Sequence, residues 1–385
     1  LTLVPVTLLV PGLYELVQVA HGGSATDSHL FMTVNMISGI VAVPVVLRLV
    51  RRWPNIRRWL AALLLVDAVA FVGMGWAPSL PVLFTFRAFD GLVHLPAVTL
   101  LMVASNRQGG IGDSRGGAFG ALASALMIGV AVGSPLGGWI VQFGPAWVYG
   151  TGSVLLVLAA VVATQMGAIP DTPRREGRYR WNWRAAFTWV PLGYGFMDRF
   201  SIGVFVSTFT IFLAEVHALS AAQRGVLIAL FMLPFAILCY PVGRLADRRG
   251  WLAPMLVGNI AFGLLFASYG IVPSALLPAV MVLSGVCSAL MFAPNLMLIS
   301  DLARLGHGEG LFGAFQVAGS LGFLAGPIVG GILVAATRSD AAGPAYTAIF
   351  AGVGSLELVL AATSLVLLRS IERRVRSHRL DAAAA

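Results

Sequence analysis

Clusters of arginine alternate with long apolar stretches along this chain, and this alternation limits the possible folds more than any other feature. All 25 basic residues are arginines. Most of them gather at 48–58, 107–115, 174–184, 244–249 and 369–379. In multi-pass membrane proteins the cytoplasmic loops carry such an excess of positive charge. The pattern therefore predicts a helical membrane protein in which every second loop is cytoplasmic.

The composition leads to the same prediction. Hydrophobic residues make up 58% of the chain and charged residues 11%, whereas an average soluble domain has about 25% charged residues. A helix needs about 20 apolar residues to cross a bilayer. Twelve such spans can be placed, at 1–20, 30–50, 59–78, 80–105, 116–143, 145–168, 185–214, 221–243, 251–272, 275–300, 310–336 and 341–368. We therefore predict an all-α protein with twelve transmembrane helices in a lipid bilayer.

The arginines also predict the orientation. With both termini in the cytoplasm, Arg224 and Arg338 fall on the far side, Arg87 and Arg199 lie within spans, and every other arginine is cytoplasmic. We expect a bacterial inner-membrane protein whose net charge of +9 reflects topology and not nucleic-acid binding. The chain shows no cofactor loop, nucleophile motif or metal-ligand spacing, so we expect no enzyme activity, cofactor or metal.

The chain repeats itself. Gly129-x-x-x-Gly133-Ser134-Pro135-Leu136-Gly137-Gly138 matches Gly322-x-x-x-Gly326-Pro327-Ile328-Val329-Gly330-Gly331, and a polar segment around Pro170–Arg178 leaves six spans on each side. Such repeats are typical of secondary transporters, which bind substrate between them. We predict two pseudo-symmetric six-helix bundles at 1–168 and 185–370, a cytoplasmic linker at 169–184 and a cytoplasmic tail at 371–385.

The segment Gly243-Arg244-Leu245-Ala246-Asp247-Arg248-Arg249-Gly250 resembles the signature loop G-x-L-a-D-r-x-G of the major facilitator superfamily. The resemblance covers essentially the whole chain and implies a twelve-helix transporter. It also implies a gating role for Gly243, Arg244, Asp247, Arg248 and Gly250, with Gly243 at a close helix contact and Asp247 as a latch. The first-half copy, Val46–Trp53, has valine where the family has glycine and aspartate.

The glycine-rich segment of the fifth span, 116–143, is similar to the antiporter motif g-x-x-x-G-P-x-x-G-G of that family, with Ser134 in the proline position. This similarity favours proton-coupled drug or metabolite antiporters. Helix packing explains the pattern equally well, because small residues four apart let helices approach closely. The packing positions are Gly129, Gly133, Pro135, Gly137 and Gly138 in span 5 and Gly322, Gly326, Pro327, Gly330 and Gly331 in span 11.

Charged residues inside spans are costly and therefore point to a function or a partner. The five acids are Glu15, Asp67, Asp90, Asp198 and Glu357. Arg87 and Asp90 lie three apart on one helical face, and His94 extends that face. Arg87-Ala88-Phe89-Asp90-Gly91 resembles the family's R-x-x-q-G motif, which implies proton coupling; a static ion pair is the alternative.

The segment around Glu15 resembles that of the embedded acid in proton-coupled multidrug antiporters. The proton-coupling candidates are therefore Glu15, Arg87, Asp90 and Asp198. We expect Asp67 and Glu357 to form interhelical hydrogen bonds. Asp198 and Arg199 are adjacent, point about 100° apart on a helix and are expected to have different partners.

The resemblance places a substrate cavity between the two halves. Its candidate lining is Tyr14, Gln18, Asn35, His94, Tyr194, Arg199, Phe205, Phe231, Asn295 and Gln316. We expect a monomeric secondary active transporter that exports a small apolar or amphipathic compound in exchange for protons. The alternatives are uptake of an organic anion held by Arg87 and Arg199, and a receptor that binds a ligand without transporting it.

Overall fold

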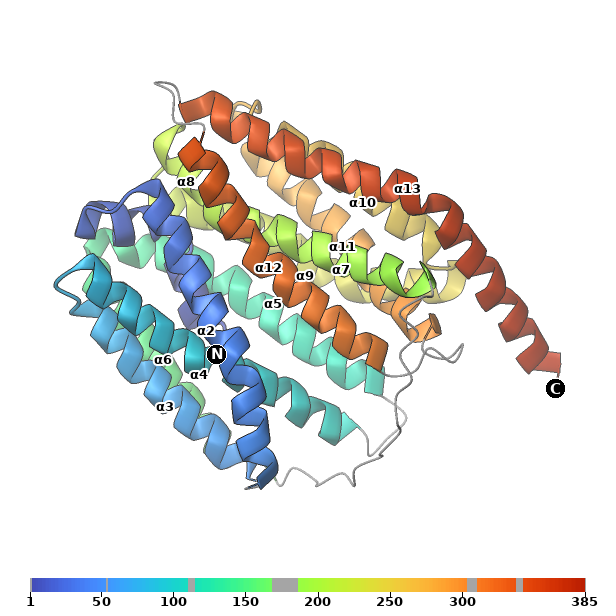
Figure 1. The fold of residues 1–385 in the computed structure, drawn as a ribbon, viewed down its shortest axis with the longest axis horizontal. Coiled ribbons are helices and arrows are strands. Elements are labelled where there is room, and N and C mark those ends of the chain that lie inside the picture. Colours follow the sequence, from blue (N-terminus) through green and yellow to red (C-terminus); the bar gives the residue numbers. More distant parts are fainter. Residues whose placement is uncertain are drawn as a thin grey trace. The chain divides into compact units, whose positions relative to one another are not determined.

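The computed structural model describes residues 2–52, 55–109, 115–167, 186–302, 310–336 and 342–384, and these residues form helices and no strand (Figure 1). In the first half of the chain the helices are α1 (Val4–Leu9), the π-helix η1 (Glu15–Val19), α2 (Ala25–Arg52), α3 (Ile56–Gly75), α4 (Leu80–Gly109), α5 (Arg115–Ile140), the 3₁₀ turn η2 (Val141–Phe143) and α6 (Pro145–Gln165).

In the second half the helices are α7 (Ala186–Val204), the π-helix η3 (Phe205–Phe209), α8 (Thr210–Glu215), α9 (Ala221–Arg249), α10 (Leu252–Ser268), the 3₁₀ turn η4 (Ser274–Leu276), α11 (Leu277–Leu302), α12 (Gly310–Ala336) and α13 (Ala342–Ala384). Each predicted span overlaps one of these helices or a run of them. In the described part of the chain, eight helices are long and apolar enough to cross a membrane, and two more apolar helices are shorter.

The first predicted span, 1–20, is not one continuous helix. It consists of α1, a turn and the π-helix η1. Pro11 and Gly12 lie in the turn. Proline cannot donate the backbone hydrogen bond that a helix interior needs, and glycine weakens a helix, so these two residues account for the interruption.

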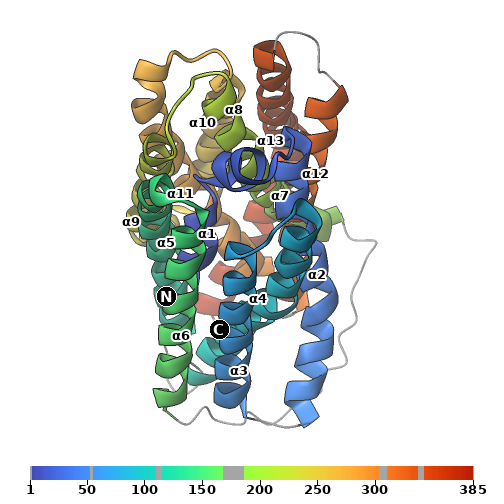
Figure 2. The ribbon, with the colours of Figure 1, turned by 90° about the vertical axis from the view of Figure 1, so that its left-hand side faces the viewer.

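One compact unit, here called unit 1, consists of Leu1–Arg174, Val206–Met232 and Pro327–Ala336. Within it α3 packs against α4 and α6, α2 packs against α4, and α1 packs against α5 and α6 (Figure 2). Unit 1 therefore contains the described helices of the first sequence half together with most of η3, all of α8 and the far-side ends of α9 and α12, where "far-side" means opposite the arginine-rich loops.

The other compact unit, unit 2, consists of Arg175–Phe205, Leu233–Gly326 and Thr337–Ala385. Within it α10 packs against α11 and α13, and α7 packs against α11 and α13. Trp251, Leu298 and Phe315 belong to its buried core. The pairs α10–α13, α10–α11 and α7–α13 repeat the pairs α3–α6, α3–α4 and α1–α6 at the corresponding positions of the other sequence half.

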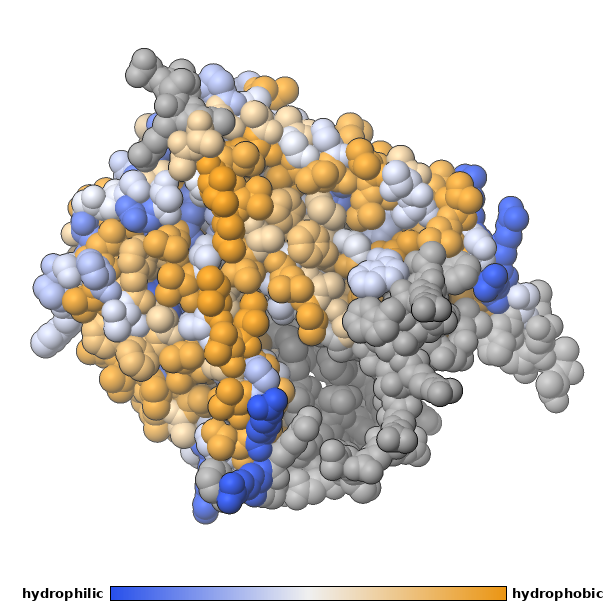
Figure 3. All heavy atoms as spheres, in the orientation of Figure 1, coloured by the Kyte–Doolittle hydropathy of each residue, from blue (hydrophilic) through white to orange (hydrophobic). Residues whose placement is uncertain are grey.

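The outward faces of several helices are apolar. On α2 the large exposed side chains include Ile37, Val41 and Val45. In Figure 3 apolar residues dominate the face toward the viewer, and hydrophilic atoms gather at the lower end of α2, the end that carries Arg48 and Arg52. This distribution is the one that a helix needs when lipid covers its length and water meets its end.

The predicted domain boundaries remain a prediction. The linker at 169–184 lies outside the described residues. The predicted tail continues α13, which runs without interruption to Ala384.

Candidate functional site

Arg87 and Asp90 form an ion pair on α4, as their spacing predicted, and both side chains are fully buried. Asn35 of α2 donates a hydrogen bond from Nδ2 to Asp90 Oδ2 over 2.8 Å. Arg87 Nε donates to the Phe31 carbonyl oxygen at 3.3 Å, and its guanidinium lies 4.5 Å from the centre of the Phe31 ring. The pair thus holds α4 against α2 and does not face solvent.

The close approach of α2 and α4 depends on Gly91. A methyl group at this position would collide with the backbone carbonyl of Asn35 and with the Ser38 hydroxyl. The sequence Asp90-Gly91 therefore brings the carboxylate within reach of the Asn35 amide.

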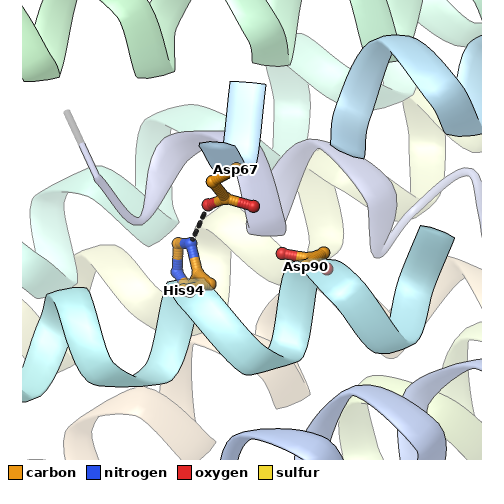
Figure 4. Close-up of side chains that lie close together, drawn as sticks. All are labelled: Asp67, Asp90 and His94. Atoms are coloured by element: carbon orange, nitrogen blue, oxygen red, sulfur yellow. Dashed lines mark hydrogen bonds and ion pairs between the residues drawn. The ribbon is translucent and has the colours of Figure 1, made fainter. Parts of the chain in front are cut away.

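Asp67 of α3 and His94 of α4 form a second buried pair in unit 1. His94 Nδ1 lies 2.8 Å from Asp67 Oδ2, and the side chains of His94 and Asp67 are 3% and 0% exposed (Figure 4). Carboxylate and imidazole atoms of Asp67, Asp90 and His94 lie within 4.8 Å of one another. The guanidinium of Arg87 already balances Asp90, and its positive charge disfavours a metal ion here. The arrangement suits a proton better.

Glu15 pairs with Arg224, a contact that joins η1 to the first turn of α9 within unit 1. The Arg224 side chain is 1% exposed and that of Glu15 is 29% exposed. The guanidinium lies 6.0 Å from the centre of the Tyr14 ring. Sequence reasoning placed Arg224 on the far side and missed this pair. Its one signal was a lone arginine beside a long apolar run, where the positive end of the helix dipole disfavours a cation.

Unit 2 holds its own group of embedded charges. Arg199 Nε lies 3.6 Å from Asp198 Oδ2. The expectation that these adjacent residues have different partners is therefore wrong, because the long arginine side chain folds back toward its neighbour. Ser201 donates a hydrogen bond to Glu357 Oε1 at 3.1 Å, and the Glu357 side chain is fully buried. Asp198 is close enough to Glu357 for their charges to interact.

The hydrogen bonds of Asp67 and Glu357 confirm the interhelical contacts predicted for these two acids. Asp67 connects α3 to α4, and Glu357 connects α13 to α7. Neither carboxylate contacts an arginine in the described part of the chain.

The other cavity candidates lie in different surroundings. Tyr194 is buried, and its hydroxyl oxygen lies 2.7 Å from that of Ser364. The ring centres of Phe205 and Tyr269 are 6.4 Å apart. Phe231 is buried, and Asn295 is buried with an Oδ1 that no described residue bonds. Gln18 and Tyr14 are half-buried, and Gln18 bonds Ser28 at 3.3 Å. The Gln316 side chain lies outside the described residues. Substrate contact at these positions stays a prediction.

The signature segment Gly243–Gly250 forms the cytoplasmic end of α9 as the topology predicts it. Gly250 has a backbone φ of +91°, a conformation that favours glycine, and it ends the helix. Arg244 is exposed and lies 5.7 Å from the Tyr240 ring. A methyl group at Gly243 would meet no described atom within 4 Å, so the close helix contact expected there stays a prediction. The side chains of Asp247 and Arg248 lie outside the described residues.

The glycines of α5 form two contacts within unit 1. Methyl groups at Gly133 and Gly137 would collide with Thr7 and with the Leu8 carbonyl oxygen in the first predicted span, and Gly129 also faces this segment. A methyl group at Gly138 would instead collide with the Ala221 carbonyl oxygen at the start of α9. Pro135 lies inside the helix, between Gly133 and Gly137.

The glycines of α12 repeat this arrangement. Methyl groups at Gly322 and Gly326 would collide with α7, at the backbones of Phe196 and Gly203. Gly330 and Gly331 lie against His29 at the start of α2, and His29 Nε2 is 3.0 Å from the Thr208 hydroxyl. Pro327 lies inside this helix between the two sets of contacts. Each glycine-rich helix therefore packs on a helix of its own sequence half and on one of the other half.

Comparisons with known proteins agree with this architecture. The family model described as Major Facilitator Superfamily matches residues 1–194 and 192–384. The crystal structure of the nucleoside transporter NupG aligns with a TM-score of 0.71 and 12% identity, over 95% of this chain and 96% of that one. A bacterial homologue of the human lysosomal transporter Spinster aligns with a TM-score of 0.70 and 12% identity, over 97% and 94% of the two chains. No curated protein matches the chain.

Proposed function

Because the chain belongs to the major facilitator superfamily, we propose that it is a secondary active transporter that exports a small apolar or amphipathic organic compound in exchange for protons. It works as a monomer in a bacterial inner membrane with both termini in the cytoplasm. The two sequence halves alternately open a shared substrate site to each side of the bilayer.

Among the described residues of the predicted spans, carboxyl groups outnumber guanidinium groups, and this surplus carries the proposal. Glu15 and Asp90 each pair with an arginine, and Asp198 lies beside Arg199. Asp67 and Glu357 contact a histidine and a serine instead. An unpaired carboxylate in a membrane helix is costly, so these groups are stable with a bound proton and become costly on losing it.

Alternating access is supported by the far-side contacts of unit 1. At Gly138–Ala221, Gly331–His29 and Glu15–Arg224, residues of the first sequence half meet residues of the second. A transporter must break these contacts to open on that side. Glycine contacts and a single ion pair suit this task, because they bury little side-chain surface that would have to be exposed again.

The direction of transport is inferred from α5. Its Gly129–Gly138 segment is similar to the antiporter motif of the family, which favours export. NupG is named as a nucleoside transporter. Nucleosides therefore belong among the first compounds to be tested, together with amphipathic amines and other drug-like molecules.

The test begins with a ligand screen by thermal shift on the detergent-purified protein at two pH values, because a bound ligand stabilises the folded protein by mass action. A compound found in this way is then followed in reconstituted vesicles with and without a proton gradient. Asp198→Asn and Glu357→Gln are each expected to lower gradient-driven flux by about 10-fold or more, which corresponds to a barrier raised by at least about 1.4 kcal/mol.

Thr363→Val is the matched control, because Thr363 lies on α13 like Glu357 but is exposed. It should leave flux unchanged. Flux that continues at the same rate after the proton gradient is collapsed would contradict the proposal.

Arg199 favours a second candidate, uptake of an organic anion. Its side chain is 32% exposed and its guanidinium lies 5.6 Å from the Phe292 ring, so it can bind a carboxylate beside an aromatic surface. Arg87 does not suit this role, because it is fully buried against Asp90. Arg199→Gln should abolish ligand stabilisation by anions and leave that by cations intact if this second candidate holds.

A further inference from the structure

The Asp67–His94 pair differs from the other embedded ion pairs of unit 1. Glu15 and Asp90 each contact a guanidinium, a group that stays positively charged at any physiological pH. Asp67 contacts an imidazole, whose charge changes near neutral pH. The charge of this one pair therefore depends on pH.

Charge balance requires a proton in this pair. Arg87 and Asp90 neutralise each other on α4. Asp67 and His94 are neutral together only when they share one proton, either as carboxylic acid and imidazole or as carboxylate and imidazolium. Without it the buried cluster carries an uncompensated negative charge, which is expensive in a membrane helix.

The groups that surround the pair do not supply the missing charge. Arg87 and Asp90 face it from α4, and Asn35 from α2 is an uncharged amide bonded to Asp90. Tyr149 of α6 is fully buried and close enough to Arg87 and Asp90 to interact with their charges. As a phenol it adds no positive charge.

We propose that Asp67 and His94 together form a reversible proton-binding site within unit 1. Two buried atoms of the pair, Asp67 Oδ1 and His94 Nε2, make no hydrogen bond to any described residue. They are the positions at which a proton can arrive or leave without breaking the Asp67–His94 bond. The proton belongs to the pair as a whole, because two groups in direct contact titrate together.

The site can influence the rest of the bundle through α4. His94 lies one helical turn from Asp90, which Asn35 ties to α2, and Arg87 is tied to α2 through the Phe31 carbonyl. Loss of the proton places a negative charge beside this junction. That this charge drives the transport cycle rests on the proposed function; the proton-binding site itself does not.

The site is tested on the full chain reconstituted in lipid, without any substrate. A dye-based measurement counts the protons taken up when the pH is lowered through the range in which histidine titrates. The wild type should take up one proton more than Asp67→Asn, in which the remaining groups are neutral without a bound proton. Asp27→Asn is the control, because Asp27 is a carboxylate of α2 that bonds Ser24 and not the cluster. The Asp27→Asn protein should take up as many protons as the wild type.

Infrared spectra of His94→Gln give a second measurement. Without the imidazole, Asp67 must keep the proton itself, so a protonated carboxyl band should persist at high pH and disappear in the double variant Asp67→Asn/His94→Gln. The double variant contains only neutral groups at these positions and should remain folded.

Equal proton uptake by the wild type and Asp67→Asn would overturn the proposal, and so would identical carboxyl bands in His94→Gln and the double variant. Flux in wild-type vesicles that ignores the proton gradient would instead overturn the proposed function. It would leave the proton site standing, because the site is measured without substrate.

Discussion

At the scale of single residues, burial is unequal within the Glu15–Arg224 pair. The arginine side chain is 1% exposed and the glutamate side chain 29% exposed. Two further atoms of Arg224, Nε and Nη1, are buried without a bond to any described residue. Removing Glu15 should therefore cost more stability than removing Arg224, because water can hydrate a lone Glu15 carboxylate but not a lone Arg224 guanidinium.

Glu15→Gln should destabilise the protein by about 3–5 kcal/mol, since it leaves a buried guanidinium without its counter-charge. Arg224→Met should cost only about 1 kcal/mol, because the remaining carboxylate is partly exposed. Thermal unfolding in detergent measures both. The double variant should resemble Arg224→Met, and an equal loss of stability in both single variants would contradict the argument.

Among the charged residues on a single helix, sequence reasoning succeeded for the pair three residues apart and failed for the adjacent Asp198 and Arg199. Arg87 and Asp90 lie three apart, and helical geometry alone brings them together. Asp67 and His94 lie on different helices, as do Glu15 and Arg224, so their pairing depends on packing that spacing does not encode. A buried acid was recognisable in the sequence, but its partner was not.

At the scale of helices, the glycines of α5 decide how closely its neighbours approach. Gly137 lies against the Leu8 carbonyl oxygen, whereas a methyl group at Gly150 of α6 would meet no described atom within 4 Å. An alanine at Gly137 therefore tests close packing, and an alanine at Gly150 tests helix propensity alone.

Gly137→Ala should lower the free energy of unfolding by about 1–3 kcal/mol, because a backbone must move to admit the methyl group. Gly150→Ala should be neutral or stabilising by up to about 1 kcal/mol, since alanine favours the helix. Thermal unfolding of the purified variants compares them. A Gly137→Ala protein as stable as Gly150→Ala would show that the α1–α5 contact is loose.

The helices themselves followed from the lengths of the apolar stretches, and the membrane-spanning class of the fold was confirmed. The break between α1 and η1 was not predicted, although Pro11 and Gly12 mark it, because prolines elsewhere lie inside unbroken helices such as α2 and α4. Proline in a membrane helix either interrupts it or is tolerated, depending on which neighbours satisfy the freed carbonyl groups.

At the scale of the whole molecule, the repeat of the sequence reappears as a repeat of helix pairs within each unit. The sequence predicted two matching halves from glycine motifs. It could not predict that η3, α8 and the ends of α9 and α12 belong to the same compact unit as the first half, because this depends on packing that the glycine motifs do not encode. The contact between His29 and Thr208 belongs to this far-side packing.

A cross-link between these positions should therefore stop transport. We expect His29→Cys/Thr208→Cys, in a chain whose Cys239 and Cys287 are replaced by serine, to lose flux when a short thiol-reactive cross-linker is added and to regain it when the link is cleaved. Vesicle flux of the compound found by the ligand screen measures the effect, with each single-cysteine chain as control. Full flux in the cross-linked protein would mean that these ends never separate.

Gly137 and Gly138 follow one another in α5 but face different neighbours, Leu8 of the same half and Ala221 of the other. In the proposed alternating-access cycle, Gly137 keeps its partner throughout and Gly138 releases its own. Water should therefore reach Gly138 once per turnover and Gly137 at no stage, so amide hydrogen exchange at two consecutive positions would distinguish the permanent architecture of this protein from its moving parts.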